Sequence, residues 1–213
     1  VKDFSFHNDE IWNIIAIKGE IVFQSFNSLF FYNGQSVKGV RLKTLPLNLF
    51  QVGDTFYSQQ INGDLFVLMH RKLEKLVSRN LLENGDVVAG LPYGNETALM
   101  LTRNEGGFLY QDGKIRKWQS ECDELLKAHT VNRAIMTKDS CYIIGTISDG
   151  IYALNREGRL LWKLNTDSRL QNNTVLGIYC DRDNNIWVAL DEGIAYIHNN
   201  SLVYYYEPPH RKI

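Results

Sequence analysis

The stretch NNTVLGIYCDRDNNIWVALDEGIAYIHNNSLVYYY, residues 172–206, decides the fold. It contains four short apolar runs, and the turns between them carry Asn, Asp or Gly. These runs predict four strands, at 175–180, 186–190, 194–198 and 202–206, joined by tight hairpin connections. One small sheet of this kind cannot bury both of its faces alone, so it needs neighbours of the same type.

The same pattern occurs five times along the chain. The preceding copy is HTVNRAIMTKDSCYIIGTISDGIYALNREGRLLWKL, residues 129–164. A small residue precedes the third apolar run of each copy, at intervals of 36, 43, 43 and 43 residues: Ser28, Asp64, Gly107, Gly150 and Gly193. A period near forty with several short strands per unit is typical of a β-propeller blade.

We therefore predict an all-β fold, a single β-propeller domain over residues 1–213 with five four-stranded antiparallel blades. The first strand of each blade is expected to be innermost. The blades are expected at about 9–42, 46–79, 86–119, 130–165 and 173–207. A short helix is expected at 122–129, whereas the repeat register assigns the amphipathic segment 70–79 to a turn and a strand.

The composition argues against several classes of function. Hydrophobic residues make up 44% of the chain, enough for a sizeable core. Lys and Arg number 23 against 24 Asp and Glu, with no strongly basic run, which argues against nucleic-acid binding through this chain. No stretch approaches the ~18 consecutive apolar residues of a membrane span, so we expect no membrane contact through this chain.

Metal and cofactor sites are not expected. The three cysteines are widely spaced without a Cys-x-x-Cys motif, and no two of the five histidines share metal-ligand spacing. Nothing marks two of the turn carboxylates as a catalytic pair. We predict no metal, no cofactor and no catalytic residue.

The last two repeats resemble the two-component regulator propeller repeat, roughly N-x-V-x-x-I-x-x-D-x-x-G-x-[IL]-W-[IV]-G-x-x-x-x-G-[IL]. The final repeat matches it at Asn173, Val175, Ile178, Asp181, Ile186, Trp187, Val188, Gly193 and Ile194. It departs from it at Asn185 and Ala189, where the family favours Gly. The fourth repeat keeps Val131, Asn132, Ile135, Gly145, Thr146, Gly150 and Ile151, with Tyr142 and Ile143 around the usual Trp. The first three repeats match only in hydrophobic pattern.

This resemblance implies a place in the periplasmic sensor region of an inner-membrane regulator of the kind common in Bacteroidetes. In that family, propellers precede an immunoglobulin-like domain, a membrane helix, and a histidine kinase or helix-turn-helix output. The implied role is sensing of glycans or their breakdown products, with control of transcription. The expected partners are an oligosaccharide or other small ligand, further propeller blades and the downstream immunoglobulin-like domain.

Candidate ligand-binding residues lie in the turns between the second and third strands, which gather on one face of a propeller. They are Asn27, Asn62, Asn104, Glu105, Ser148, Asp149, Asp191 and Glu192. Amides and carboxylates in a ring could hydrogen-bond sugar hydroxyls. The alternative, which we favour for any single residue, is that they are ordinary turn formers. The four tryptophans, Trp12, Trp118, Trp162 and Trp187, are interpreted as packing residues rather than sugar platforms.

The leading segment VKDFSF, residues 1–6, resembles the fourth strand of an upstream blade. We therefore expect the chain to be a section of a larger propeller. Uncovered terminal blades favour association, so two or more copies are expected to pair through the surfaces near Trp12 and near residues 204–206.

Three hypotheses for the function follow. The first is a non-enzymatic, ligand-sensing propeller module of a bacterial regulator. The second is a propeller glycosidase or lyase, which requires two carboxylates roughly 5–9 Å apart in a cleft. The third is a scaffold for protein interactions.

Overall fold

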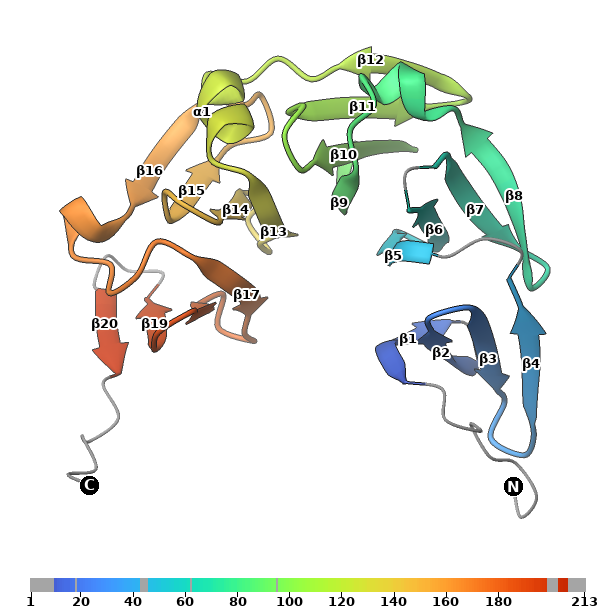
Figure 1. Ribbon diagram of the computed structural model, residues 1–213. Helices are drawn as coiled ribbons and strands as arrows, with labels where there is room; N and C mark the ends of the chain where they lie inside the picture. Colours follow the sequence, from blue (N-terminus) through green and yellow to red (C-terminus); the bar gives the residue numbers. More distant parts are fainter. Residues whose placement is uncertain are drawn as a thin grey trace. The chain divides into compact units, whose positions relative to one another are not determined.

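The computed structural model describes residues 10–17, 19–42, 46–61, 63–94, 96–198 and 203–206. Residues 1–6 and Asn62 therefore lie outside the described part of the chain. Apart from one short α-helix and two 3-10 turns, the described elements are strands, and they form five four-stranded antiparallel sheets of the β-propeller type (Figure 1). The predicted fold class is confirmed.

Each sheet is one blade, and its strands are hydrogen-bonded in chain order. Blade 1 contains β1 (Ile11–Ile17), β2 (Glu20–Ser25), β3 (Ser28–Tyr32) and β4 (Val37–Arg41). Blade 2 contains β5 (Pro46–Val52), β6 (Thr55–Gln60), β7 (Leu65–Met69) and β8 (Lys72–Val77). Blade 3 contains β9 (Val87–Gly94), β10 (Thr97–Thr102), β11 (Gly107–Gln111) and β12 (Lys114–Lys117). Blade 4 contains β13 (Val131–Met136), β14 (Tyr142–Thr146), β15 (Ile151–Leu154) and β16 (Leu160–Leu164). Blade 5 contains β17 (Val175–Cys180), β18 (Ile186–Leu190), β19 (Ile194–Ile197) and β20 (Val203–Tyr206).

The contacts divide the chain into two compact units, Val1–Leu81 with blades 1 and 2, and Leu82–Ile213 with blades 3 to 5. In the first unit, Val22, Leu29 and Phe31 of blade 1 pack against Leu49 of blade 2. A buried cluster therefore joins the two sheets of this unit.

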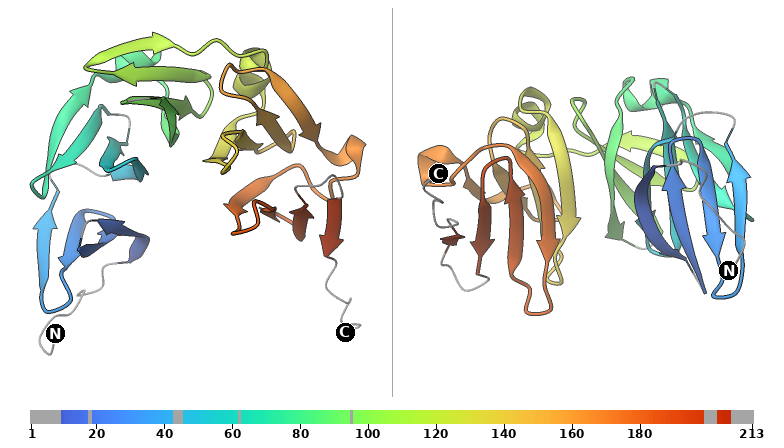
Figure 2. Two further views of the ribbon diagram at one scale, coloured as in Figure 1. Left: turned by 180° about the vertical axis from the view of Figure 1, so that it is seen from behind. Right: turned by 60° about the horizontal axis from the view of Figure 1, so that its bottom comes forward.

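In the second unit, the first strands lie next to one another. Strand β13 packs beside β9 on one side and β17 on the other (Figure 1), and Figure 2 shows the strands of blade 5 from two further directions. This confirms for blades 3 to 5 that the first strand is innermost.

Two buried clusters hold the second unit together. Leu99 of blade 3 and Tyr142 of blade 4 belong to the first, and Ile143 of blade 4 and Val188 of blade 5 belong to the second. Neighbouring residues Tyr142 and Ile143 enter different clusters because successive side chains of a strand point to opposite faces of the sheet. Apolar side chains from the same strands therefore lie on both faces of the blade 4 sheet.

The predicted helix exists as α1 (Asp123–Ala128). Leu126 of α1 and the preceding Cys122 are buried in the cluster between blades 3 and 4. The segment predicted as a turn and a strand is β8, followed by the 3-10 turn Arg79–Leu82. The strand expected at 202–206 is described from 203 onward.

The hairpin turns place glycine where the backbone requires it. In blade 3 the residue before the third strand is Gly106, with φ of 72°, and not Gly107, which begins β11. Gly150 has φ of 74°, and a Cβ added there would lie 2.1 Å from the carbonyl oxygen of Leu164. Only glycine fits such a left-handed and crowded position.

The tryptophans interpreted as packing residues differ in how far the described residues bury them, and Trp187 is less buried than that interpretation predicts. Trp118 is 2% exposed, and Trp162 packs against the cluster between blades 4 and 5. Trp12 and Trp187 are 66% and 44% exposed. Trp187 lies on the face of blade 5 opposite the buried cluster, whereas Trp12 lies at a register shift of β1 and lines a pocket with Pro46 and Ile61 of the second blade.

Candidate functional site

The turns between the second and third strands hold seven described candidates. Most of these residues form hydrogen bonds that hold their own turn, or an adjacent connection, in place. In blade 3, Asn104 Nδ2 donates to the carbonyl oxygen of Lys127 at 3.2 Å and to Thr130 Oγ1 at 2.9 Å. The Glu105 N–H donates to Thr102 Oγ1 at 3.0 Å. The Asn104 amide therefore ties this turn to the connection that leads into blade 4.

The candidates in the turns of blades 1 and 5 also form hydrogen bonds that hold the local backbone. Asn27 Oδ1 accepts a hydrogen bond from Ser28 Oγ at 2.9 Å. The Asp191 N–H donates to the Thr174 carbonyl oxygen at 3.0 Å, and the Asp191 and Glu192 side chains are exposed. These residues shape their hairpins, as the alternative interpretation predicted.

Blade 4 differs, because Asp149 is 8% exposed and sits at the centre of a polar cluster. Lys163 Nζ lies 2.6 Å from Asp149 Oδ2, and Asn165 Nδ2 donates to Asp149 Oδ1 at 3.0 Å. The Tyr152 hydroxyl donates to the same carboxylate. A charge this well buried is stable only when it is paired and hydrogen-bonded.

The accessible edge of this cluster is formed by His129 and Ser148. His129 Nε2 lies 3.5 Å from Asp149 Oδ2, and His129 Nδ1 lies 3.0 Å from Ser148 Oγ. Ser148 is exposed, and the His129 side chain is about one-third exposed. The candidates Ser148 and Asp149 are therefore brought together, and they are joined by residues that the sequence analysis did not select.

The electrostatics of the cluster follow from its contacts. Burial alone would raise the pKa of Asp149, but hydrogen bonds from Lys163, Tyr152 and Asn165 lower it below its ordinary value. Burial and the neighbouring Asp149 carboxylate both raise the pKa of Tyr152. Asp149 is thus held as an anion and Tyr152 as a neutral donor, a pairing that stabilises the turn.

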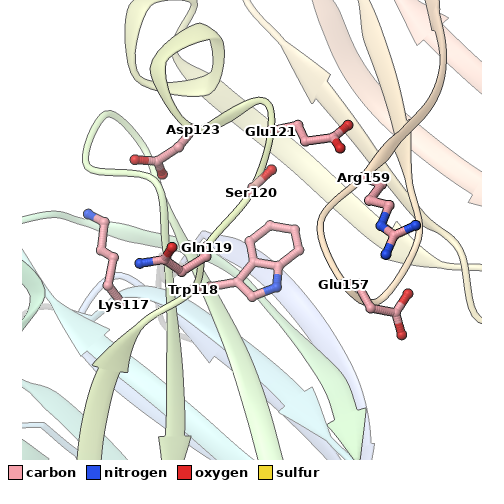
Figure 3. A pocket seen from close by; sticks show the side chains of 8 residues that line it. All are labelled: Lys117, Trp118, Gln119, Ser120, Glu121, Asp123, Glu157 and Arg159. Atoms are coloured by element: carbon pink, nitrogen blue, oxygen red, sulfur yellow. The ribbon is translucent and has the colours of Figure 1, made fainter.

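A second polar site is a cavity of about 470 Å³ where the connection from blade 3 meets the third hairpin of blade 4 (Figure 3). Its lining residues come from the end of β12, the connection to α1, and the turn before β16: Lys117, Trp118, Gln119, Ser120, Glu121, Asp123, Glu157 and Arg159. We call it the connection pocket.

The connection pocket has a fixed base. The Glu121 N–H and Ser120 Oγ both donate to the carbonyl oxygen of Gly158, at 2.9 and 3.1 Å. Trp118 Nε1 donates to the Arg156 carbonyl oxygen at 3.3 Å, and its ring meets Tyr142 edge to face at 5.8 Å. These bonds hold the two sides of the pocket together before any ligand arrives.

The walls of the connection pocket offer groups for a polar ligand. Among the described residues, no hydrogen bond or ion pair engages the side chains of Gln119, Glu157 or Arg159. Asp123 Oδ1 is buried without a hydrogen-bond partner, while Asp123 Oδ2 pairs with Lys127. The pocket therefore presents an amide, a guanidinium and carboxylates, both donors and acceptors.

Within the described ranges, no group of three or more His, Cys, Asp or Glu side chains could hold a metal ion. Burial raises the pKa of the Cys122, Cys141 and Cys180 thiols, which disfavours the reactive thiolate form. In the same part of the chain, no helix has the length and apolar character needed to span a membrane.

Comparison with known proteins places the last blade in a family. Residues 169–192, from the connection before β17 to the turn after β18, match the family model described as Two component regulator propeller. These residues are a two component regulator propeller repeat. The repeat carries the Asp181 turn, in which Asp181 accepts hydrogen bonds from the Asn185 N–H at 2.9 Å and from Trp187 Nε1 at 3.1 Å. The resemblance found in the sequence is confirmed.

Solved structures with the same fold extend the comparison to nearly the whole chain. One is the extracellular domain of BT3049 from B. thetaiotaomicron, assigned as a hybrid two component system, with a TM-score of 0.78 and 16% identity over 95% of this chain. Another is the extracellular domain of BT4673, assigned as a one component system from the same organism, with a TM-score of 0.71 and 19% identity over 94% of this chain. This chain covers 29% and 28% of those two chains, so it spans less than a third of each.

An enzyme shares the fold as well. Virginiamycin B lyase from Staphylococcus aureus matches 97% of this chain with a TM-score of 0.75 and 11% identity, over 72% of the lyase chain. At such low identity the likeness shows the propeller fold and carries no activity with it. No curated protein sequence matches the chain.

Proposed function

We propose that this chain is a ligand-sensing, non-enzymatic propeller module from the periplasmic side of a bacterial signal-transduction regulator, and that its ligand is an oligosaccharide. The observation that carries the sensing role is the propeller repeat at 169–192, together with the match of the same blades to extracellular domains of two regulators. The immunoglobulin-like domain, pairing of copies and control of transcription belong to the same proposal.

The connection pocket supports a polar, hydroxyl-rich ligand. Gln119 can donate and accept, Arg159 can donate, and Glu157 can accept, all without giving up an existing hydrogen bond. Pairs of donors and acceptors of this kind match the vicinal hydroxyls of a sugar. Because Trp118 is 2% exposed, recognition there depends on hydrogen bonds and not on stacking.

The turn candidates have a smaller part in this proposal. Asp149 is already saturated by its partners, so it is not free to bind a sugar hydroxyl. Ser148 and His129 form the accessible edge of the Asp149 cluster and can extend a binding surface. Asp191 and Glu192 are exposed turn residues.

The test is a binding screen of oligosaccharides against the 213-residue protein by calorimetry, with product analysis of the same mixtures. The paired substitution Glu157→Gln and Arg159→Gln should remove binding, because it removes both charged groups; Glu157→Gln is nearly isosteric, whereas Arg159→Gln also shortens the side chain. Glu192→Gln, at an exposed turn position, is the matched control and should bind as the native protein does. Release of a smaller sugar or an unsaturated product would instead support the glycosidase or lyase hypothesis.

A further inference from the structure

The seam between blades 1 and 2 ends in a small cavity of about 180 Å³. Its described lining comes from the first two strands of blade 1 with the turn that follows them, and from blade 2: Trp12, Gln24, Ser25, Phe26, Pro46 and Ile61. We call it the seam pocket. Along the rest of the seam, Val22 and Leu29 pack against Leu49. Asn13 Nδ2 also donates to the Leu49 carbonyl oxygen at 3.0 Å, so the two blades are fixed to each other beside the pocket.

A register shift in blade 1 brings Trp12 to the seam pocket. The shift lies between Ile11 and Asn13, and the pairing with β2 skips Trp12. Each of the other four sheets has such a shift between its first two strands, and a shift of this kind re-aims a side chain. In blade 4 the skipped residue is Asn132, which donates through Nδ2 to the Val175 carbonyl oxygen of the next blade at 2.8 Å. Trp12 is instead 66% exposed and forms a wall of the pocket.

Gln24 supplies a buried polar group to the seam pocket. The residue is 4% exposed, and Gln24 Oε1 is buried without a hydrogen-bond partner among the described residues. At the same register position blade 2 has Gln59, whose Nε2 donates to the carbonyl oxygen of Gly63 in its own turn at 3.3 Å. Blades 3 to 5 have apolar or small residues there: Leu101, Gly145 and Ala189. The blade therefore needs no amide at this position, and a bound donor would offset the cost of burying an unpaired carbonyl oxygen.

The other walls of the seam pocket favour a ligand that is apolar over most of its surface. Phe26 and Ile61 are 54% and 43% exposed, and Pro46 adds an apolar ring. Ser25 Oγ is engaged in its own turn, where it donates to the Ser28 carbonyl oxygen at 3.3 Å and accepts from the Ser28 N–H at 3.1 Å. A sugar ring in this pocket would lose water from several hydroxyls without gaining partners for them. Since a cavity of roughly 150 Å³ accommodates benzene, the pocket has the size for a single aromatic ring.

We propose that the seam pocket binds a phenol, whose ring packs against the exposed rings of Trp12 and Phe26 and whose hydroxyl donates a hydrogen bond to Gln24 Oε1. Both contacts add to the effect of burying the apolar ring. The seam pocket belongs to the first unit and the connection pocket to the second. The proposal is therefore independent of the sugar proposed for the connection pocket.

The first test compares 4-methylphenol with toluene, which has the same ring and methyl group but no hydroxyl. Ligand-observed NMR titration of the 213-residue protein gives both dissociation constants, and the shift of the Trp12 indole N–H signal locates the ligand. We expect saturable binding of 4-methylphenol, about fivefold tighter than that of toluene, because only the phenol can donate to the buried acceptor. Equal affinity for the two ligands, or no saturation with 4-methylphenol, overturns the proposal without any need for a variant.

Substitutions then separate the hydrogen bond from the packing. Gln24→Leu places in blade 1 the residue type that blade 3 buries at Leu101, so the protein should unfold at no lower temperature than the native one. It should bind 4-methylphenol no better than toluene, whereas a retained preference would contradict the proposal. Trp12→Ala should weaken binding of 4-methylphenol about fivefold or more. Trp187→Ala, at an exposed ring outside the pocket, is the matched control, and an equal loss there would show unspecific adhesion to aromatic rings.

Three further measurements identify the occupant. The tripeptide glycyl-tyrosyl-glycine presents the same phenol on a peptide: tighter binding than 4-methylphenol, again dependent on Gln24, identifies a protein tyrosine as the source of the ring, and weaker binding identifies a free phenol. Self-association in sedimentation that Trp12→Ala abolishes would assign the pocket to a second copy and overturn the proposal. The Glu157→Gln, Arg159→Gln variant should bind 4-methylphenol as the native protein does, so failure of sugar binding and failure of phenol binding are separate results.

Discussion

Replacing Asp149 by Asn tests whether the Asp149 cluster stabilises the second unit. The carboxylate is 8% exposed and receives hydrogen bonds or ion-pair contacts from Lys163, Tyr152 and Asn165. Asn keeps the shape but removes the charge and places an NH₂ group or a neutral oxygen toward Lys163. The ammonium then loses its counter-ion in a partly buried site.

The size of the effect follows from burial. Removing one partner of a fully buried ion pair costs about 3–5 kcal/mol. The Lys163 side chain is 30% exposed and can recover part of its hydration, so we expect Asp149→Asn to lower the free energy of unfolding by about 2–3 kcal/mol. Glu192→Gln, at the exposed carboxylate that precedes the turn glycine of blade 5, should change it by less than about 0.5 kcal/mol.

Urea unfolding at neutral pH, followed by circular dichroism, measures both values. The double variant Asp149→Asn with Lys163→Met should recover part of the loss, because it removes the unpaired ammonium as well. If Asp149→Asn and Glu192→Gln give the same free energy of unfolding, the buried carboxylate does not stabilise the fold and the reasoning fails.

The pH dependence gives an independent check of the same cluster. The folded pKa of Asp149 lies below its ordinary value, so the unfolded state binds the proton first as the solution is acidified. The stabilisation is therefore complete above about pH 4 and is lost as the pH falls through the lower folded value. The difference between the native protein and Asp149→Asn should be constant from pH 5 to 7 and shrink below about pH 4; a difference that grows on acidification would contradict this sign.

Three other substitutions test the packing. Gly150→Ala should lower the free energy of unfolding by about 2 kcal/mol or more, because φ is 74° and the new Cβ would meet a carbonyl oxygen. Gly94→Ala is the control in the same unfolding assay and should be tolerated, because there is open space around Gly94. Tyr142→Phe should lower the free energy of unfolding by about 1–2 kcal/mol, because the buried hydroxyl donates to a carbonyl oxygen of blade 3 at 2.8 Å. Tyr32→Phe is the control and should lower it much less, because the Tyr32 hydroxyl forms its hydrogen bond at an exposed position. Trp187→Phe should cost about 0.5–1 kcal/mol, because it removes the hydrogen bond from Trp187 Nε1 to Asp181 at 3.1 Å and keeps an aromatic ring against Tyr196; an unchanged free energy of unfolding would mean that this bond does not stabilise the turn.

The strands were predictable because two local signals agree. Alternating apolar runs and turn residues place β17 and β18 within the predicted bounds, Val175–Cys180 and Ile186–Leu190. Because the pattern repeats along the chain, the same antiparallel order of four strands is predicted for every blade. Strand bounds still differ by a residue in places, as in blade 3, where β11 begins at Gly107, before the apolar run, and the left-handed turn residue is Gly106.

The site residues were less predictable because they meet only after the blades pack. His129 and Lys163 lie 20 residues before and 14 residues after Asp149, on different elements, with no fixed spacing to signal their contact. The connection pocket is formed by one blade's connection and the next blade's hairpin, so no local pattern could indicate it. Trp187 was misjudged for a related reason, since the exposure of a strand residue depends on what covers its sheet.

The central claim is that the chain senses an oligosaccharide without transforming it. Titration calorimetry of purified oligosaccharides into the native protein, with chromatographic analysis of each recovered ligand, tests both halves of this claim together. The account predicts saturable binding of at least one oligosaccharide, its loss in the Glu157→Gln, Arg159→Gln variant, and recovery of the ligand intact. Recovery of cleaved ligand, with cleavage abolished by substituting one carboxylate, would contradict it, as would the absence of any saturable binding.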